Sequence, residues 1–123
     1  MLDISYILLF VDNPGASAAF YEALLDANPV ESSPTFALFV FPSGLKLGLW
    51  SRRHAEPAPT GSSGSAEIAV ALASNAAVET TYDAWRRKGV PIVQTPTEMD
   101  FGRTFVAADP DGHRIRVFHP NMR

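Results

Sequence analysis

The side chains that could do chemistry in this chain are few, and they do not form a familiar catalytic pattern. Its three histidines are His54, His113 and His119, and it has no cysteine. None of these histidines lies at ligand spacing from another histidine or a carboxylate, so we interpret each as exposed or locally bonded. The lack of cysteine excludes disulfides, thiolate metal sites and cysteine nucleophiles.

Aromatic residues recur instead at alternate positions of strand-like segments. Tyr6 and Phe10 share one face of the first segment, and Trp50 shares a face with Gly48 in a later one. We expect Tyr6, Phe10 and Trp50 to form an aromatic wall beside a gap left by Gly48. A flat ring that stacks on such a wall gains about 0.5–1.5 kcal/mol per aromatic pair beyond simple burial.

The second half carries charged residues where the first half carries aromatic ones. Glu67 and Arg116 lie on strands expected to be neighbours, so we predict an ion pair between them. Arg103 is a candidate fork for a ligand carboxylate. Met99 and Phe101 precede it and could close over a ligand as an adaptable apolar lip.

Each of these residues also has a purely structural interpretation. Trp50 could be a core tryptophan, the Glu67–Arg116 pair could be structural, and Arg103 could stabilise a turn or lie on the surface. Trp85, on a predicted helix beside Tyr82, fits the core better than a site. A strand with apolar residues on both faces leaves undecided which of its aromatic side chains are core: Phe36, Phe39 and Phe41.

The order of the predicted elements repeats. Residues 4–51 and 66–118 each read as strand, helix and three strands, with helices over 14–25 and from Ser74 or Asn75 to Lys88. Pro42-Ser43-Gly44 and Asp109-Pro110-Asp111-Gly112 predict hairpin turns. The strands are predicted over 4–11, 30–32, 35–41, 45–51, 66–72, 91–97, 103–108 and 113–118.

Length and composition bound the possibilities. A chain of 123 residues is one domain by size, and we expect residues 52–65, rich in proline, glycine and serine, to be a mobile linker between its two modules. The formal net charge of −3 and the absence of a long basic run argue against a nucleic-acid partner. The first residues resemble neither a signal peptide nor a membrane span, so we expect a cytoplasmic protein.

The chain resembles the vicinal oxygen chelate superfamily, which includes glyoxalase I, extradiol dioxygenases and bleomycin-resistance proteins. The resemblance covers nearly the whole chain. It is carried by Val11-Asp12-Asn13, Ala19-Phe20-Tyr21, Phe105-Val106 and Asp109-Pro110-Asp111-Gly112-His113. The stretch 101–105, residues 115–117 and Leu49-Trp50-Ser51 are similar to its phenazine-antibiotic resistance proteins. The resemblance implies an α+β fold, with two βαβββ modules forming a curved mixed sheet around a ligand cleft, and a homodimer.

Members of this superfamily that use a metal take one ligand from each of four strands. The corresponding positions here are Tyr6, Gly48, Glu67 and Arg116. Glycine offers no side chain and arginine brings a positive charge, so the four cannot hold a divalent cation as a set. We therefore predict no metal and no other cofactor.

Three functions are compatible with these residues. The leading hypothesis is a metal-free protein that sequesters a planar aromatic, phenazine-like antibiotic without chemistry and so confers resistance. The second is an enzyme, either a metal-dependent lyase, isomerase or dioxygenase, or a metal-free isomerase with Glu67 as its base, although a neighbouring Arg116 would lower the pKa of that base. The third is an interaction module whose cleft is filled by its own side chains.

Overall fold

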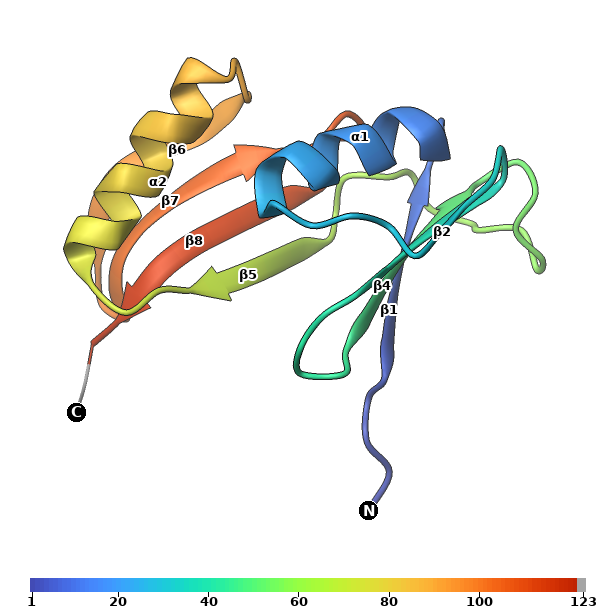
Figure 1. Cartoon of the computed structure of the whole chain (residues 1–123), viewed down its shortest axis with the longest axis horizontal. Coiled ribbons are helices and arrows are strands. Elements are labelled where there is room, and N and C mark those ends of the chain that lie inside the picture. The colour runs from blue at the N-terminus through green and yellow to red at the C-terminus, as the bar shows by residue number, and fades with distance from the viewer. Residues whose placement is uncertain (122–123) are drawn as a thin grey trace. The chain divides into compact units, whose positions relative to one another are not determined.

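The computed structural model describes residues 1–121 and contains two compact units, residues 1–63 and residues from Gly64 onward. Each unit contains a strand, a helix and three further strands, as the sequence predicts (Figure 1). Each set of strands forms a four-stranded mixed sheet, so the fold is α+β. Neither helix within residues 1–121 is long and apolar enough to cross a membrane.

The first unit consists of β1 (Tyr6–Val11), α1 (Pro14–Leu25), β2 (Glu31–Ser32), β3 (Phe36–Val40) and β4 (Lys46–Ser51). Its sheet has the order β1-β4-β3-β2, and β1 runs parallel to β4 while the other pairs are antiparallel. The helix starts as the sequence predicts: the Asn13 side chain accepts a hydrogen bond from Ala16 N at 3.1 Å, and Pro14 takes the first helical position.

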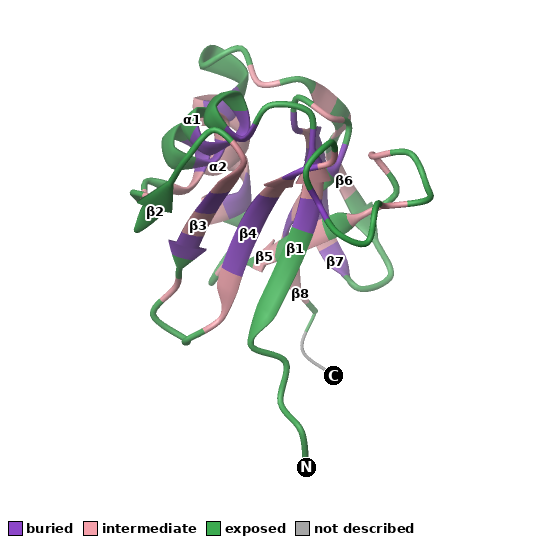
Figure 2. Ribbon diagram, turned by 90° about the vertical axis from the view of Figure 1, so that its right-hand side faces the viewer, coloured by how far each residue is buried: buried purple, intermediate pink, exposed green. Residues whose placement is uncertain are grey.

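One face of this sheet packs against α1 and forms the core of the unit. Leu9, Leu49 and Phe39 are almost fully buried, as is Tyr21 of the helix. Alternation along β3 separates its aromatic residues, since Phe39 enters the core and Phe36 lies on the other face, where it pairs with Trp50. Figure 2 shows the buried centre of β4 beside the exposed first half of β1.

The segment after β4, which the sequence predicts to be a mobile linker, is held against the first unit. Arg52 donates to Ser63 Oγ at 2.7 Å and to the Gly61 carbonyl at 2.6 Å, and Ser63 Oγ in turn donates to the Phe10 carbonyl at 2.8 Å. Ala55 is only 3% exposed. Proline, glycine and serine therefore shape an anchored loop over residues 52–63.

The second unit consists of β5 (Glu67–Ala71), α2 (Asn75–Arg87), β6 (Ile92–Met99), β7 (Gly102–Ala108) and β8 (Arg114–Pro120). Its sheet has the order β5-β8-β7-β6, in which β5 and β8 are parallel and the other pairs are antiparallel. Both sheets therefore place their first strand parallel to their last. Ser74 caps α2 by accepting a hydrogen bond from Ala77 N at 3.0 Å.

The core of the second unit lies between α2 and one face of its sheet. Phe105 of β7 meets the rings of Tyr82 and Trp85 edge to face, with centroid distances of 5.4 and 5.3 Å. Trp85 is 5% exposed, which confirms its assignment to the core. Because Phe105 points toward α2, its neighbour Thr104 points to the opposite face of the sheet, which we call the open face of the second sheet.

The turn between β7 and β8 is built by Asp109, as the Asp-Pro-Asp-Gly sequence predicts. Its Oδ1 accepts hydrogen bonds from Asp111 N at 2.8 Å and His113 N at 2.9 Å, while Gly112 has a positive φ of 85°. His113 is buried and accepts from Gly64 N. His119 belongs to β8 and does not follow the last strand, because that strand extends to Pro120.

Candidate functional site

An open pocket lies on the face of the first sheet opposite α1. It has a volume of about 390 Å³ and is lined by Tyr6, Leu8, Phe36 and Trp50. Strand register explains this grouping, because Leu8 lies beside Gly48 in β4 and Phe36 lies beside Trp50. Pockets that take drug-sized ligands have volumes of about 300–1,000 Å³ and mostly apolar walls. The four side chains offer such a wall.

The rings around this pocket are arranged for contact with a flat molecule. Trp50 lies 6.4 Å from Phe36 at an interplanar angle of 86°, and 6.3 Å from Phe10 at 33°. Lys46 Nζ stands 5.1 Å from the centroid of the Tyr6 ring, a cation–π contact. Three predicted residues, Tyr6, Phe10 and Trp50, are therefore brought together on one face.

Gly48 does not leave the expected gap. A Cβ at this position would lie 2.5 Å from Leu8 Cδ2 and 2.9 Å from Phe36 Cε1, so the space above the glycine is already taken by these two side chains. The prediction of an empty space there is wrong, because the neighbouring strands β1 and β3 each supply a large side chain to it. Because Gly48 has no side chain, the side chains of Leu8 and Phe36 can lie over this part of β4.

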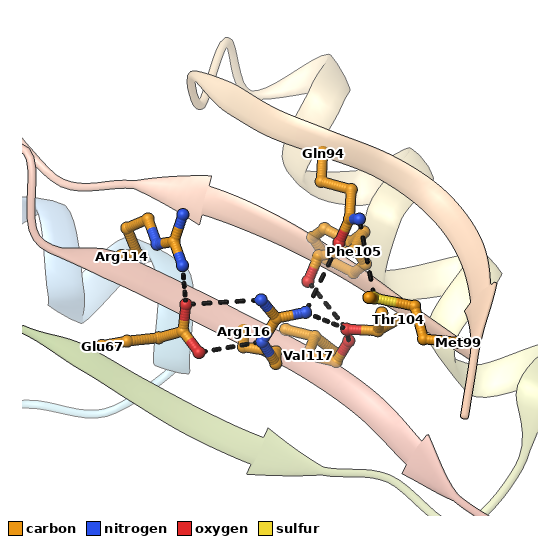
Figure 3. Close-up of polar contacts among 8 residues, drawn as sticks. All are labelled: Glu67, Gln94, Met99, Thr104, Phe105, Arg114, Arg116 and Val117. Atoms are coloured by element: carbon orange, nitrogen blue, oxygen red, sulfur yellow. Dashed lines mark hydrogen bonds and ion pairs between the residues drawn. The ribbon is translucent and has the colours of Figure 1, made fainter. Parts of the chain in front are cut away.

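The open face of the second sheet carries a charged network centred on Glu67 (Figure 3). Arg116 Nε lies 2.8 Å from Glu67 Oε2, and Arg116 Nη2 lies 3.4 Å from Oε1. Arg114 Nη2 approaches Oε1 at 2.7 Å. The predicted Glu67–Arg116 ion pair is confirmed, and Arg114 joins it because residues 114 and 116 share one face of β8.

These arginines lower the pKa of Glu67. The hydrogen bond from Arg116 is the largest cause, partial burial opposes it, and the charge of Arg116 and the contacts of Arg114 add to the lowering. Glu67 is thus an ionised carboxylate at neutral pH whose lone pairs are engaged by guanidinium groups. Such a carboxylate is a poor general base, since a base works best with a pKa near the operating pH.

Arg116 is fixed from several sides. Its Nη1 donates to Thr104 Oγ1 at 3.2 Å and to Gln94 Oε1 at 3.4 Å, and its guanidinium stands 5.5 Å from the centroid of the Phe101 ring. Phe101 also meets Phe118 edge to face at 5.8 Å. Gln94 extends the cluster, as its amide nitrogen lies 3.7 Å from the sulfur of Met99. Glu67, Met99, Phe101 and Arg116 therefore belong to one cluster.

Arg103 lies on the other face of the second sheet. Its Nε donates to Glu79 Oε1 of α2 at 2.6 Å, and Glu98 lies 4.0 Å from its Nη1. The sequence interpretation of Arg103 as a fork for a ligand carboxylate conflicts with this geometry, because alternation along β7 directs it toward the helix and away from Arg116. Arg103 joins helix to sheet, and we leave it out of the proposed site.

Sequence reasoning missed several residues of the two faces. The sequence does not decide whether Phe36 belongs to the core, and it does not single out Leu8 or Arg114 as site residues. Thr104 gave a usable signal in hindsight, since it is a polar residue beside the apolar run 105–108, whereas Gln94 stands among other polar residues of β6 and gave none. Thr104 is fully buried and also donates to the Val117 carbonyl at 3.0 Å.

The four positions that correspond to metal ligands do not offer a donor set for a divalent cation. Both oxygens of Glu67 are bonded to arginine, Arg116 is itself a cation, and the space above Gly48 is filled. Within residues 1–121, no three histidine or acidic side chains come close enough together to hold a metal ion. The residues present therefore do not fit the metal that the resemblance implies for enzymes.

A second pocket, of about 600 Å³, lies at the start of α1, and most of the residues that line it have polar side chains. Asp12 and Arg53 form an ion pair there at 2.5 Å, and Ser51 Oγ lies 2.9 Å from His54 Nδ1. These groups bond to one another, so a ligand would have to break the existing contacts. We regard this pocket as a feature of the loop that ends the first unit.

Comparison with known proteins gives the chain a family. The family model described as the glyoxalase/bleomycin resistance protein/dioxygenase superfamily matches residues 3–117. A curated relative, the phenazine antibiotic resistance protein EhpR of Enterobacter agglomerans, is 30% identical over 113 residues, which span 89% of this chain and 86% of the relative.

Solved structures share the fold of this chain. A protein of Agrobacterium tumefaciens, determined by solution NMR, is 48% identical over 99% of this chain and all of its own, with a TM-score of 0.89. A glyoxalase/bleomycin resistance protein/dioxygenase from Nocardioides is 22% identical, covers all of this chain with 87% of its own, and shares the fold with a TM-score of 0.81. The protein therefore belongs to the glyoxalase/bleomycin resistance protein/dioxygenase superfamily.

Proposed function

We propose that the protein binds and sequesters a planar aromatic small molecule of the phenazine kind, without making or breaking a bond and without a metal. It would act as a cytoplasmic homodimer. Light scattering coupled to size-exclusion chromatography would test the dimer by measuring the molar mass of the protein in solution. Binding of this kind confers resistance stoichiometrically, since each bound antibiotic molecule is withdrawn from its target.

The observation that carries this proposal is the aromatic pocket of the first unit. Tyr6, Leu8, Phe36 and Trp50 line it, and Trp50 meets both Phe36 and Phe10 through its ring faces and edges. A planar heteroaromatic ligand would replace water over these rings. It gains stacking in addition to the burial of apolar surface.

Two further points favour binding over catalysis. The relative EhpR is named for resistance to phenazine antibiotics, which makes this ligand class the first to test. In addition, Glu67, the acidic residue among the four positions where enzymes of the superfamily bind metal, is ionised and occupied by two arginines. A lowered pKa opposes its use as a general base.

The test is a fluorescence titration with phenazine, corrected for ligand absorbance and repeated with a chelator. The chain has two tryptophans: Trp50 lines the pocket, and Trp85 belongs to α2 and is buried against Phe105. In a Trp85→Phe variant all tryptophan emission comes from Trp50, and we expect saturable quenching that the chelator leaves unchanged. The matched Trp50→Phe variant keeps only the buried reporter, and we expect it to lose most of the quenching.

Two results would overturn the proposal. Quenching that never saturates with any planar aromatic ligand would indicate a surface that does not bind this class. Binding that appears only after a divalent metal is added would point to a metal-dependent lyase, isomerase or dioxygenase instead.

A further inference from the structure

We propose that the open face of the second sheet binds an aromatic carboxylate, with Arg114 as the residue that pairs with the carboxylate group. This site belongs to the second unit. It adds a charged ligand group to the aromatic recognition proposed above, and it does not require the pocket around Trp50.

Charge is the first argument. The open face carries two guanidinium groups, Arg114 and Arg116, and they share the single carboxylate of Glu67. These three residues together give the open face a formal charge of +1, although the whole chain has a net charge of −3. A local cationic face on an acidic protein favours a small anion over a neutral molecule of the same shape.

The two arginines differ in how exposed they are and in how many of their guanidinium nitrogens already have a partner. The side chain of Arg116 is 18% exposed, and its Nε, Nη1 and Nη2 all contact Glu67, Thr104 or Gln94. The side chain of Arg114 is 46% exposed, and its contact with Glu67 is made through Nη2. Arg116 and Arg114 both contact Glu67 (Figure 3), so Arg116 positions Glu67 and Glu67 steadies Arg114. The partly exposed side chain of Arg114 leaves the rest of its planar fork for a ligand.

Apolar groups lie next to Arg116 on the same face, two residues along β8 from Arg114. Phe101 stands under the guanidinium of Arg116 and packs against Phe118. In the neighbouring strand, Ala69 pairs with Arg116 and Ala71 pairs with Phe118, so small side chains leave this part of the sheet uncovered. Arg114 and Arg116 are two residues apart, about 7 Å along the strand, so a carboxylate paired with Arg114 and a ring beside Phe101 would lie on the same face of the sheet.

The experiment compares two matched probes by isothermal titration calorimetry at pH 7 and fixed ionic strength: phenazine-1-carboxylate and phenazine-1-carboxamide. They share the ring and differ in charge, so the ratio of their affinities isolates the contribution of the carboxylate. We expect the native protein to bind the carboxylate about tenfold more tightly. In Arg114→Gln the ratio falls to about one, while the carboxamide affinity is kept, because the exposed arginine is replaced by a neutral side chain.

Arg86→Gln is the control, since it removes the same charge from an exposed arginine at the end of α2. We expect this variant to keep the preference. Arg114→Lys, which keeps the charge but not the planar fork, should retain only part of it.

Equal affinities of the native protein for the two probes would overturn the inference, and so would equal losses in Arg114→Gln and Arg86→Gln or a complete lack of binding. Two outcomes separate this inference from the proposed function. Tight binding of both probes with a ratio of one refutes the role of Arg114 alone. A carboxylate preference without quenching of Trp50 supports Arg114 and refutes the aromatic pocket.

Discussion

Glu67 and Arg116 meet side by side, with Oε2 2.8 Å from Nε and Oε1 3.4 Å from Nη2. This two-point contact joins two of the four positions that the sequence resemblance matches to metal ligands. It turns the acidic residue of the open face into part of an ion-pair network that has its own dependence on pH.

The first prediction concerns that pH dependence. Because the pKa of Glu67 is lower in the folded protein than in the unfolded chain, its contribution to stability is present above the unfolded pKa, near pH 4, and is lost as the pH falls through the folded value. Glu67→Gln should therefore lower the free energy of unfolding by roughly 0.5–1 kcal/mol at pH 7. Urea unfolding of both proteins at pH 7, 5 and 3 should show a difference that is equal at the first two values and shrinks at the third.

A difference that grows toward acid pH would contradict the stabilising role of the ionised carboxylate. Glu22→Gln on the exposed side of α1 is a suitable control, and we expect it to behave as the native protein does.

The second prediction concerns Gly48. In Gly48→Ala the new methyl group meets Leu8 and Phe36, whose side-chain ends must move because the added Cβ would lie under 3.0 Å from them. We expect a loss of about 1–2 kcal/mol in unfolding free energy and a changed near-ultraviolet circular dichroism spectrum, since Phe36 is in contact with Trp50. Gly61→Ala should alter neither, because nothing lies within 4 Å of a Cβ at residue 61. An unchanged spectrum in Gly48→Ala would show that Phe36 does not move.

The third prediction separates the two tryptophans by their contribution to stability. Trp85→Ala removes a 5% exposed ring that packs on Phe105, and it should cost about 3–5 kcal/mol. Trp50 is only partly buried and lines an open pocket, so less buried apolar surface is lost when it is replaced. Trp50→Ala should therefore lower the free energy of unfolding by roughly 1–2 kcal/mol less than Trp85→Ala does. Urea unfolding followed by far-ultraviolet circular dichroism measures both. Equal losses would place Trp50 in the core.

The fourth prediction concerns the helix–sheet contact of Arg103. Arg103→Ala and Glu79→Ala each remove one side of an ion pair between β7 and α2, and the double variant should lose little more than either single one. The coupling energy should be about 0.5–1 kcal/mol, as befits a partly exposed pair. Neither change should alter the preference between acidic and neutral ligands. A selective loss of acidic ligands in Arg103→Ala would restore its interpretation as a ligand-binding residue.

Much of the fold could be predicted from local signals. Asn13-Pro14 and Ser74 mark the starts of the helices through capping, and Asp109 with Gly112 marks a hairpin through turn chemistry. Alternation then assigned Tyr6, Trp50, Glu67 and Arg116 to the faces on which they lie, because side chains in a strand alternate strictly. These signals depend on residues that are close together in the sequence, so they can be recognised without knowledge of the folded structure.

What escaped prediction depends on contacts between strands that are distant in sequence. The gap expected above Gly48 is filled by Leu8 and Phe36, which only the register of β1 and β3 against β4 reveals. The ligand-binding role expected for Arg103 conflicts with its hydrogen bond to Glu79, a residue of α2 that is distant in the sequence. The segment 52–63 has the composition of a flexible linker, yet Arg52 and Ser63 tie it down through bonds that composition does not encode.

The parallel pairing of first and last strand in each sheet gives the two halves of the chain equivalent ladders. Lys46 and Trp50 in β4 stand opposite Tyr6 and Phe10, just as Arg114 and Phe118 in β8 stand opposite Glu67 and Ala71. The pairs named in the first ladder contain three aromatic rings, and those in the second contain the Glu67–Arg114 ion pair, so the solvent acts on the two ladders differently. Added salt screens the ionic ladder and, for excluded salts such as sulfate, strengthens apolar contacts in the aromatic one. A change in salt concentration therefore affects the contacts of the two sheets in different ways.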